Sequence, residues 1–157
     1  MAAVGYVTGR ALFRPSRRVV QPIVFNHQKH VEDVGMECID CHELVETGRH
    51  AGLPTLTICM DCHEEPVSDH PEEQKVRDLA QAGQDDVFLK LFRLADHAFY
   101  THRRHVAVAG IECETCHGGI AETTVPPERP LVRITMKHCV DCHQNEGVSS
   151  DCSRCHR

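Results

Sequence analysis

The chain lacks tryptophan and has few aromatic residues of any kind, with five phenylalanines and two tyrosines among 157 residues. Charged residues make up 25% of it, so side chains alone supply a thin hydrophobic interior for one domain or two small ones. A long apolar run is also missing. Residues 1–13 are mildly apolar but too short to span a bilayer, and they lack the basic start and apolar stretch of a signal peptide. The polypeptide therefore needs something else to fill its core.

Cysteine and histidine are both in excess, at ten and thirteen residues. This usage is typical of a chain that is organised around disulfides or bound metal. All ten cysteines fall into Cys-x-x-Cys pairs that are followed directly by histidine, and none is left over. The five motifs are Cys38, Cys41 and His42; Cys59, Cys62 and His63; Cys113, Cys116 and His117; Cys139, Cys142 and His143; and Cys152, Cys155 and His156.

Five such motifs predict five covalently bound haem c groups. Two thiols at this separation can form thioether bonds to the two haem vinyl groups, and the following histidine reaches the iron from the same side as proximal ligand. Zinc ribbons use such pairs two at a time, so five pairs would leave one without a partner, and zinc gives no reason for the histidines. A thioredoxin-like disulfide would be a single motif between a strand and a helix.

The chain also contains an internal repeat. Residues 25–42 match residues 100–117 at eight of eighteen positions, and each copy reads aromatic-x-His-x-x-His, seven further positions, Cys-x-x-Cys-His. This pattern indicates a duplicated module. We expect a tail or remnant of a membrane anchor at residues 1–20, one module with haems 1 and 2 at 21–68, a connecting helical segment at 69–98, and a second module with haems 3, 4 and 5 at 99–157.

Regular secondary structure is expected to be sparse. Residues 71–82 predict a helix, with Pro71 in its first turn, apolar Val76 and Leu79 three positions apart, and Gly83 as its stop. His70, beside the proline, fits a helix cap or a surface residue. Residues 87–94 form an apolar run that fits either a strand or a short helix. Three prolines at positions 126, 127 and 130 predict an extended loop before the fourth haem motif.

Eight histidines remain outside the motifs and could supply the second ligand of each iron. The repeat favours His27, His30, His102 and His105, because two histidines three apart on one helical face can serve two different haems. The fifth distal ligand stays open between Met136, His50, His97 and His138. Five haems in a globule with a radius of gyration of about 15 Å must be neighbours, and irons with two protein ligands favour conduction of electrons over catalysis.

The aromatic-x-His-x-x-His and Cys-x-x-Cys-His pattern resembles the class III multihaem cytochromes, the c7 and c3 group. Residues 21–27, 51–54, 59–63, 99–102 and 136–139 are similar in order and spacing to the haem subunits of alternative complex III and of the menaquinone reductase complex. The resemblance implies mostly loops and short α-helices wrapped around haems, with little or no sheet. It also supports the four histidines of the repeat as distal ligands and makes Met136 the first choice for the fifth.

The resemblance further implies an electron-transfer subunit, not an enzyme, of a membrane quinol-linked respiratory oxidoreductase complex. Its partners would be iron-sulfur and quinol-binding membrane subunits, on the periplasmic side of the cytoplasmic membrane, where haem is attached. No nucleic-acid partner is expected. The alternatives are a free periplasmic carrier of the c7 type with a soluble redox partner, a multihaem reductase with one open iron, and a subunit of a conductive filament.

Overall fold

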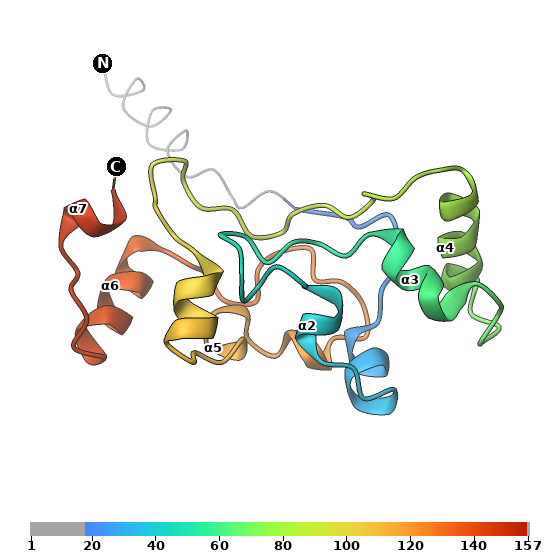
Figure 1. The fold of residues 1–157 in the computed structure, drawn as a ribbon, viewed down its shortest axis with the longest axis horizontal. Helices are drawn as coiled ribbons and strands as arrows, with labels where there is room; N and C mark the ends of the chain where they lie inside the picture. The colour runs from blue at the N-terminus through green and yellow to red at the C-terminus, as the bar shows by residue number, and fades with distance from the viewer. Residues whose placement is uncertain (1–17, 157) are drawn as a thin grey trace, which may run out of the picture.

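A computed structural model describes residues 18–156 as a row of short helices joined by long loops (Figure 1). Within this range no strands pair into a sheet, and a single antiparallel bridge joins Ala98 to His156. The prediction of loops and short helices with little or no sheet is confirmed. In chain order the elements are η1 (Lys29–Asp33), α2 (Cys38–Cys41), α3 (Leu56–His63), α4 (Pro71–Gln81), η2 (Arg104–Val108), α5 (Glu114–His117), η3 (Ile120–Glu122), α6 (Met136–Asn145) and α7 (Cys152–Cys155).

The helices follow one another along the long axis of the molecule. In Figure 1, α3 and α4 lie at one end, α2 and α5 in the middle, and α6 and α7 at the other end. The order in space differs from the order in the chain, because α2 lies between α3 and α5. Loops from both halves of the sequence run alongside these helices: Gln28 donates its backbone N–H to the Thr123 carbonyl, and His102 donates its own to the Arg49 carbonyl.

The sequence repeat is also a structural repeat. The elements η1 and η2 are both one-turn π-helices, and their first residues, Lys29 and Arg104, occupy matching positions in the two copies. π-Helical turns occur frequently at functional sites. Each is followed by a glycine with positive φ, Gly35 at 81° and Gly110 at 65°, a conformation that residues with a Cβ rarely adopt. Both copies therefore leave the helical turn in the same way before their haem motif.

Helix α4 forms where the sequence predicts it and ends at Gln81, just short of the expected position. Pro71 occupies its first turn, and the Nδ1 atom of His70 accepts a hydrogen bond from the backbone N–H of Glu72 at 3.3 Å. The interpretation of His70 as a helix cap is thus confirmed. Gly83, with φ of 71°, follows the helix as expected.

The apolar run at residues 87–94 forms neither a strand nor a helix. Its backbone is held from the side by Gln21, whose amide nitrogen donates to the Leu89 carbonyl at 2.7 Å and whose amide oxygen accepts from the Leu89 N–H at 2.9 Å. Val87 and Phe88 pack against the core. These two residues cover the core, whereas Leu89 and Leu94 further along the run stay exposed. The proline-containing loop before α6 is irregular, as predicted.

The hydrophobic core of the described polypeptide is small. Ile23, Leu56 and Val76 form its buried centre where α3 packs against α4, and Val45 is buried separately. Cys59 and Met60 of α3 lie partly buried at the edge of this core. The prediction of a thin interior is confirmed, and large apolar side chains in many other places stay exposed to solvent.

Leu56 is fully buried at the centre of this core, with 0% of its surface exposed. We expect Leu56→Ala to lower the free energy of unfolding of the haem-loaded protein by about 2–5 kcal/mol, because it removes apolar contacts and leaves a cavity. Leu56→Met keeps the volume and is expected to cost less than about 1.5 kcal/mol. Denaturant unfolding followed by circular dichroism measures both, and equal losses for the two variants would contradict this role.

Residues 1–17 and 157 lie outside the described range, and with them most of the segment expected to be a tail or anchor remnant. Between residues 18 and 156, no helix combines the length and the apolar composition that crossing a membrane requires.

Candidate haem-binding sites

Each of the five Cys-x-x-Cys-His motifs lies on or against a short helix. The cysteines of one motif are three positions apart, so a helical turn places both thiols on the same face. The first, third and fifth motifs coincide with the one-turn helices α2, α5 and α7, whereas the second and fourth lie within the longer helices α3 and α6. All ten cysteines have free thiols. The turn thus presents two thiols and the following histidine together.

Four motif histidines face a second histidine from another part of the chain. The centres of the His30 and His63 rings are 6.1 Å apart, and those of His102 and His117 are 6.3 Å apart. The other two ring pairs are His105 with His143 at 6.1 Å, and His97 with His156 at 5.2 Å.

This spacing fits an iron between two imidazoles. A metal–nitrogen bond is about 2.0 Å long, and the centre of an imidazole ring lies about 1.15 Å beyond its nitrogen. Two imidazoles on opposite sides of one metal would therefore have ring centres about 6.3 Å apart. Three of the observed pairs, at 6.1, 6.3 and 6.1 Å, agree with that separation. The residues present therefore fit haem iron with one proximal and one distal histidine. The fourth pair, His97 with His156 at 5.2 Å, is closer than the bridging geometry requires.

The repeat predicts that His27 and His42 form the remaining pair. Burial, followed by the proximity of His42 and then of His30, lowers the pKa of His27 to about 4, so its ring is neutral, as iron coordination requires. The Nδ1 atom of His27 lies 3.2 Å from the hydroxyl oxygen of Thr123. In the repeat, His27 and His42 occupy the positions that His102 and His117 occupy in the second module.

The three ring pairs within the modules follow one rule. In the second module the first histidine of the aromatic-x-His-x-x-His segment faces the first motif, and the second histidine faces the second motif. In the first module His30 faces the second motif in the same way, and the rule predicts that His27 serves His42. In the second module His102 goes with His117 and His105 with His143.

Most of these histidines hold their Nδ1 atom against a backbone carbonyl. His30 contacts the Asn26 carbonyl at 2.8 Å, and His105, its counterpart in the second module, contacts the Thr101 carbonyl at the same distance. A carbonyl can only accept, so Nδ1 carries the proton and Nε2 is left free to bind a metal. The same contact recurs at His42 with Gly52, His102 with Arg49 and His143 with Ser149.

The aromatic residue that opens each segment packs against its two histidines. The Phe25 ring lies edge-on to His27 at 4.8 Å and stacks on His30 at 4.4 Å. Tyr100 repeats both contacts in the second module, at 5.1 and 4.5 Å, and burial raises its pKa to about 12. Phe92, which the sequence did not single out, lies 4.5 Å from His117 in the same edge-on manner.

The candidates for the fifth distal ligand lie in different surroundings. Met136 begins α6 and is 71% exposed, His50 is also exposed, and His138 is half-buried. Among the four, His97 alone has a ring contact with a motif histidine in the described structure. The antiparallel bridge between Ala98 and His156 fixes this contact, together with a hydrogen bond from the Phe99 N–H to the Cys155 carbonyl at 2.6 Å.

Neighbouring motifs are close enough for their thiols to interact. Burial raises the pKa of Cys59 to about 11, and Cys41 of the first motif adds to this rise. The pKa of Cys113 is raised mainly by burial and next by the nearby thiol of Cys38. The pKa of Cys116 is raised mainly by burial and next by the thiols of Cys142 and Cys139. The pKa of Cys139 is raised mainly by burial and next by the thiol of Cys155. These electrostatic interactions between thiols link the motifs in the order second, first, third, fourth, fifth.

A buried polar network lies at the α3–α4 end and was not predicted from the sequence. Glu73 and Arg77, each 7% exposed, form an ion pair at 2.7 Å. Val67 donates its backbone N–H to Glu73 at 2.7 Å, and the Ser68 hydroxyl donates at 2.5 Å. The Ser68 hydrogen bond, helped by those from Val67 and Arg77, outweighs burial and holds the pKa of Glu73 well below its usual range. Glu73 therefore remains a carboxylate.

Two comparisons with known proteins agree with these sites. Residues 98–157 match the family model described as cytochrome c7 and related cytochrome c. The chain is also 33% identical, over 162 residues, to the multihaem cytochrome c subunit of menaquinone reductase from Nitratidesulfovibrio vulgaris, in an alignment that covers 87% of this chain and 77% of that protein.

Proposed function

Since the chain belongs to the multihaem c-type cytochromes of the cytochrome c7 type, we propose that it relays electrons along five haems as a subunit of a membrane quinol-linked oxidoreductase complex. Membership in this family means that it binds haem c covalently and transfers electrons. The haem count, the ligands and the complex are the proposal. A bound haem would supply an iron that alternates between its ferric and ferrous states.

The pairing of histidines carries this proposal. Four of the five motif histidines face a second histidine, and three of these pairs have the ring spacing of imidazoles on opposite sides of a metal. Irons with two protein ligands have no open position for a substrate, so the chain's own residues support conduction and not catalysis. In this proposal His97 replaces Met136 as the fifth distal ligand, because the His97 ring lies against the ring of the motif histidine His156.

The order of the helices in space supports one unbranched row of haems. The helices that carry the motifs follow the order second, first, third, fourth, fifth along the long axis in Figure 1, and the electrostatic influence of neighbouring thiols on one another follows the same order. The row would thus end at α3 on one side and at α7 on the other. Electrons would enter at one end and leave at the other.

The relative in N. vulgaris is a subunit of menaquinone reductase by name. By analogy we infer iron-sulfur and quinol-binding membrane subunits as partners, on the periplasmic side of the cytoplasmic membrane. The chain is acidic, with a formal net charge of −6 at pH 7. We expect the partner subunits to present a complementary, basic surface to it.

The proposal is tested on the haem-loaded protein from its native host. Affinity purification from detergent-solubilised membranes should recover large membrane subunits, and the mass of the chain should exceed that of the polypeptide by five haems. Electron paramagnetic resonance (EPR) during a redox titration should show only low-spin ferric haem, with no change on adding nitrite. The absorption spectrum of the reduced protein should not change on adding carbon monoxide. A chain without membrane partners would indicate a free carrier, and a high-spin haem in undamaged protein would indicate an enzyme.

A further inference from the structure

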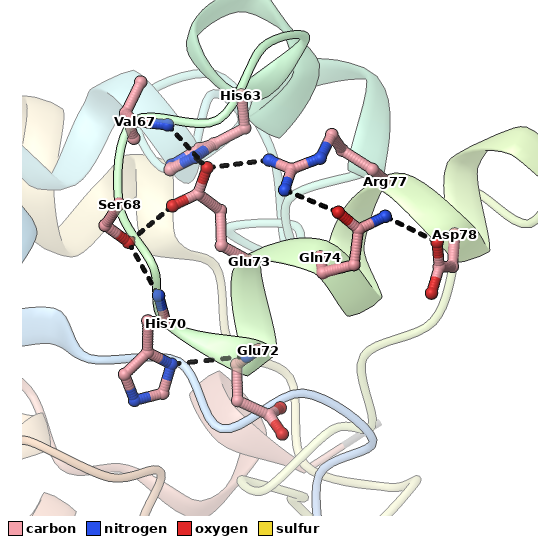
Figure 2. Close-up of polar contacts among 9 residues, drawn as sticks. All are labelled: His63, Val67, Ser68, His70, Glu72, Glu73, Gln74, Arg77 and Asp78. Atoms are coloured by element: carbon pink, nitrogen blue, oxygen red, sulfur yellow. Dashed lines mark hydrogen bonds and ion pairs between the residues drawn. The ribbon is translucent and has the colours of Figure 1, made fainter.

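Glu73 lies at the α3–α4 end of the molecule, buried under a set of groups that fix its carboxylate in place (Figure 2). One of its oxygens, Oε1, accepts hydrogen bonds from Val67 and from Arg77. The other, Oε2, accepts from Ser68. Buried charges are costly unless they are paired and hydrogen-bonded, and this carboxylate meets both conditions.

The same carboxylate faces His63, the histidine of the second motif. The Nδ1 atom of His63 is buried and has no hydrogen-bond partner within normal geometry, while Oε1 of Glu73 lies 3.5 Å away. Figure 2 shows the imidazole directed towards this oxygen. An unpaired buried donor is destabilising, so this atom calls for an acceptor.

His63 differs in this respect from two other motif histidines. The Nδ1 atoms of His42 and His143 contact the carbonyl oxygens of Gly52 and Ser149. These acceptors are neutral, whereas Glu73 is anionic. A carboxylate that accepts the proton of a metal-bound imidazole makes that ligand more basic than a carbonyl does.

A more basic, anion-facing ligand favours the oxidised form of the iron, which carries one more positive charge. Arg77 offsets part of this effect, but it reaches Glu73 from the side of α4 and not from that of His63 (Figure 2). Hydrogen bonding and charge behind a haem ligand are among the features that set its reduction potential. The effect should be confined to one site.

We propose that Glu73 is a positioning residue that accepts a hydrogen bond from the Nδ1–H group of His63. Its negative charge lowers the reduction potential of the haem bound by the second motif. The inference rests on the proposed function, because it requires His63 to bind iron. The haem at the α3 end of the row then has a lower reduction potential than it would have if a neutral carbonyl accepted the proton of His63. That end is then the natural place for electrons to enter from a strongly reducing donor.

The test is Glu73→Gln in the haem-loaded protein, with the potential of each haem measured by redox titration. The amide keeps the shape but removes the charge. Changes in groups behind a metal ligand typically cost about 10–100-fold in metal affinity or activity, and we take the lower end of that range for the redox equilibrium. We expect the oxidised-to-reduced ratio of one haem to fall at least about tenfold at a fixed potential, which corresponds to a rise of about 59 mV for one electron.

Two further variants separate this role from a structural one. Arg77→Gln leaves the carboxylate uncompensated and should shift the same haem to lower potential, the opposite direction. Asp78→Asn removes one negative charge from the exposed side of α4 but keeps an oxygen that can accept from Gln74, the residue that holds Arg77 (Figure 2). It should leave all potentials unchanged. The EPR signal of one low-spin haem should change in Glu73→Gln, because its histidine loses anionic character.

If Glu73→Gln does not incorporate haem, Glu73→Asp keeps the charge pair but withdraws the carboxylate from His63, and the same haem should shift upward by less. The comparison uses whichever of these two variants carries its full haem complement. The inference would be overturned if the haem potentials of that variant equalled those of the wild type. A wild type with fewer than five low-spin haems would contradict the proposed function instead. In that case the haem attached to Cys59 and Cys62 still reports on Glu73.

Discussion

Without covalent haem the chain is expected to lose its fold. The described polypeptide buries only a handful of apolar side chains, centred on Leu56, whereas native domains retain only about 5–15 kcal/mol of stability after much larger opposing terms cancel. In the proposed arrangement the haem faces supply the missing core. Haem removal should therefore unfold the protein, as metal removal unfolds small metal-dependent domains.

The experiment compares the chain made in cells that lack the machinery for haem attachment with the haem-loaded protein. Circular dichroism and hydrogen exchange, in reducing buffer to prevent disulfides, should show little helix and no slowly exchanging amides. As a control, Cys152→Ala combined with Cys155→Ala removes only the last motif, on the one-turn helix α7. It should lose one haem and keep the rest folded. A cooperative unfolding transition in the haem-free chain would contradict the prediction.

Local rules were enough to predict the elements that depend on local sequence. Helix α4 has a proline in its first turn and a glycine just beyond its end, and the structure places it almost as predicted. The spacing of the motifs predicted covalent haem, and membership in the cytochrome c7 type confirms it. These signals succeed because the thioether chemistry and helix capping both act between residues a few positions apart.

Contacts between distant segments were not predictable in this way. The sequence of residues 87–94 fits a strand or a helix, but the side chain of Gln21, far from Leu89 in the chain, holds them extended. From the sequence, Glu73 is an ordinary acidic residue in the first turn of a helix. Its burial results from the packing of α4 on α3 and from the loop that brings Ser68 over it.

The fifth distal ligand shows the same limit. His97 lies far from Cys152 and Cys155 in sequence, and it falls outside the repeat that identified the other four histidines. Only the antiparallel bridge at Ala98 brings it to His156. Met136 was preferred on resemblance, because it lies just before the fourth motif. In the structure it starts α6 with its side chain 71% exposed.

Replacement of His97 by alanine should therefore convert one haem from low spin to high spin and open its iron to carbon monoxide. The ring centres of His97 and His156 are 5.2 Å apart, which is shorter than the spacing of two imidazoles on one iron. The exposed His97 has room to move outward and reach that spacing. Loss of one axial ligand leaves a single coordination position vacant. The other four haems should keep their spectra.

Met136→Leu is the matched control, because it removes the competing ligand and keeps the apolar volume. EPR spectra and carbon monoxide difference spectra of both variants should be recorded on protein with a verified haem count. We expect one new high-spin signal in His97→Ala and none in Met136→Leu. The reverse result would assign the position to Met136, since a methionine ligand also gives its haem a higher potential than two histidines do. The α7 end of the row would then be the high-potential exit for electrons and not a second bis-histidine site.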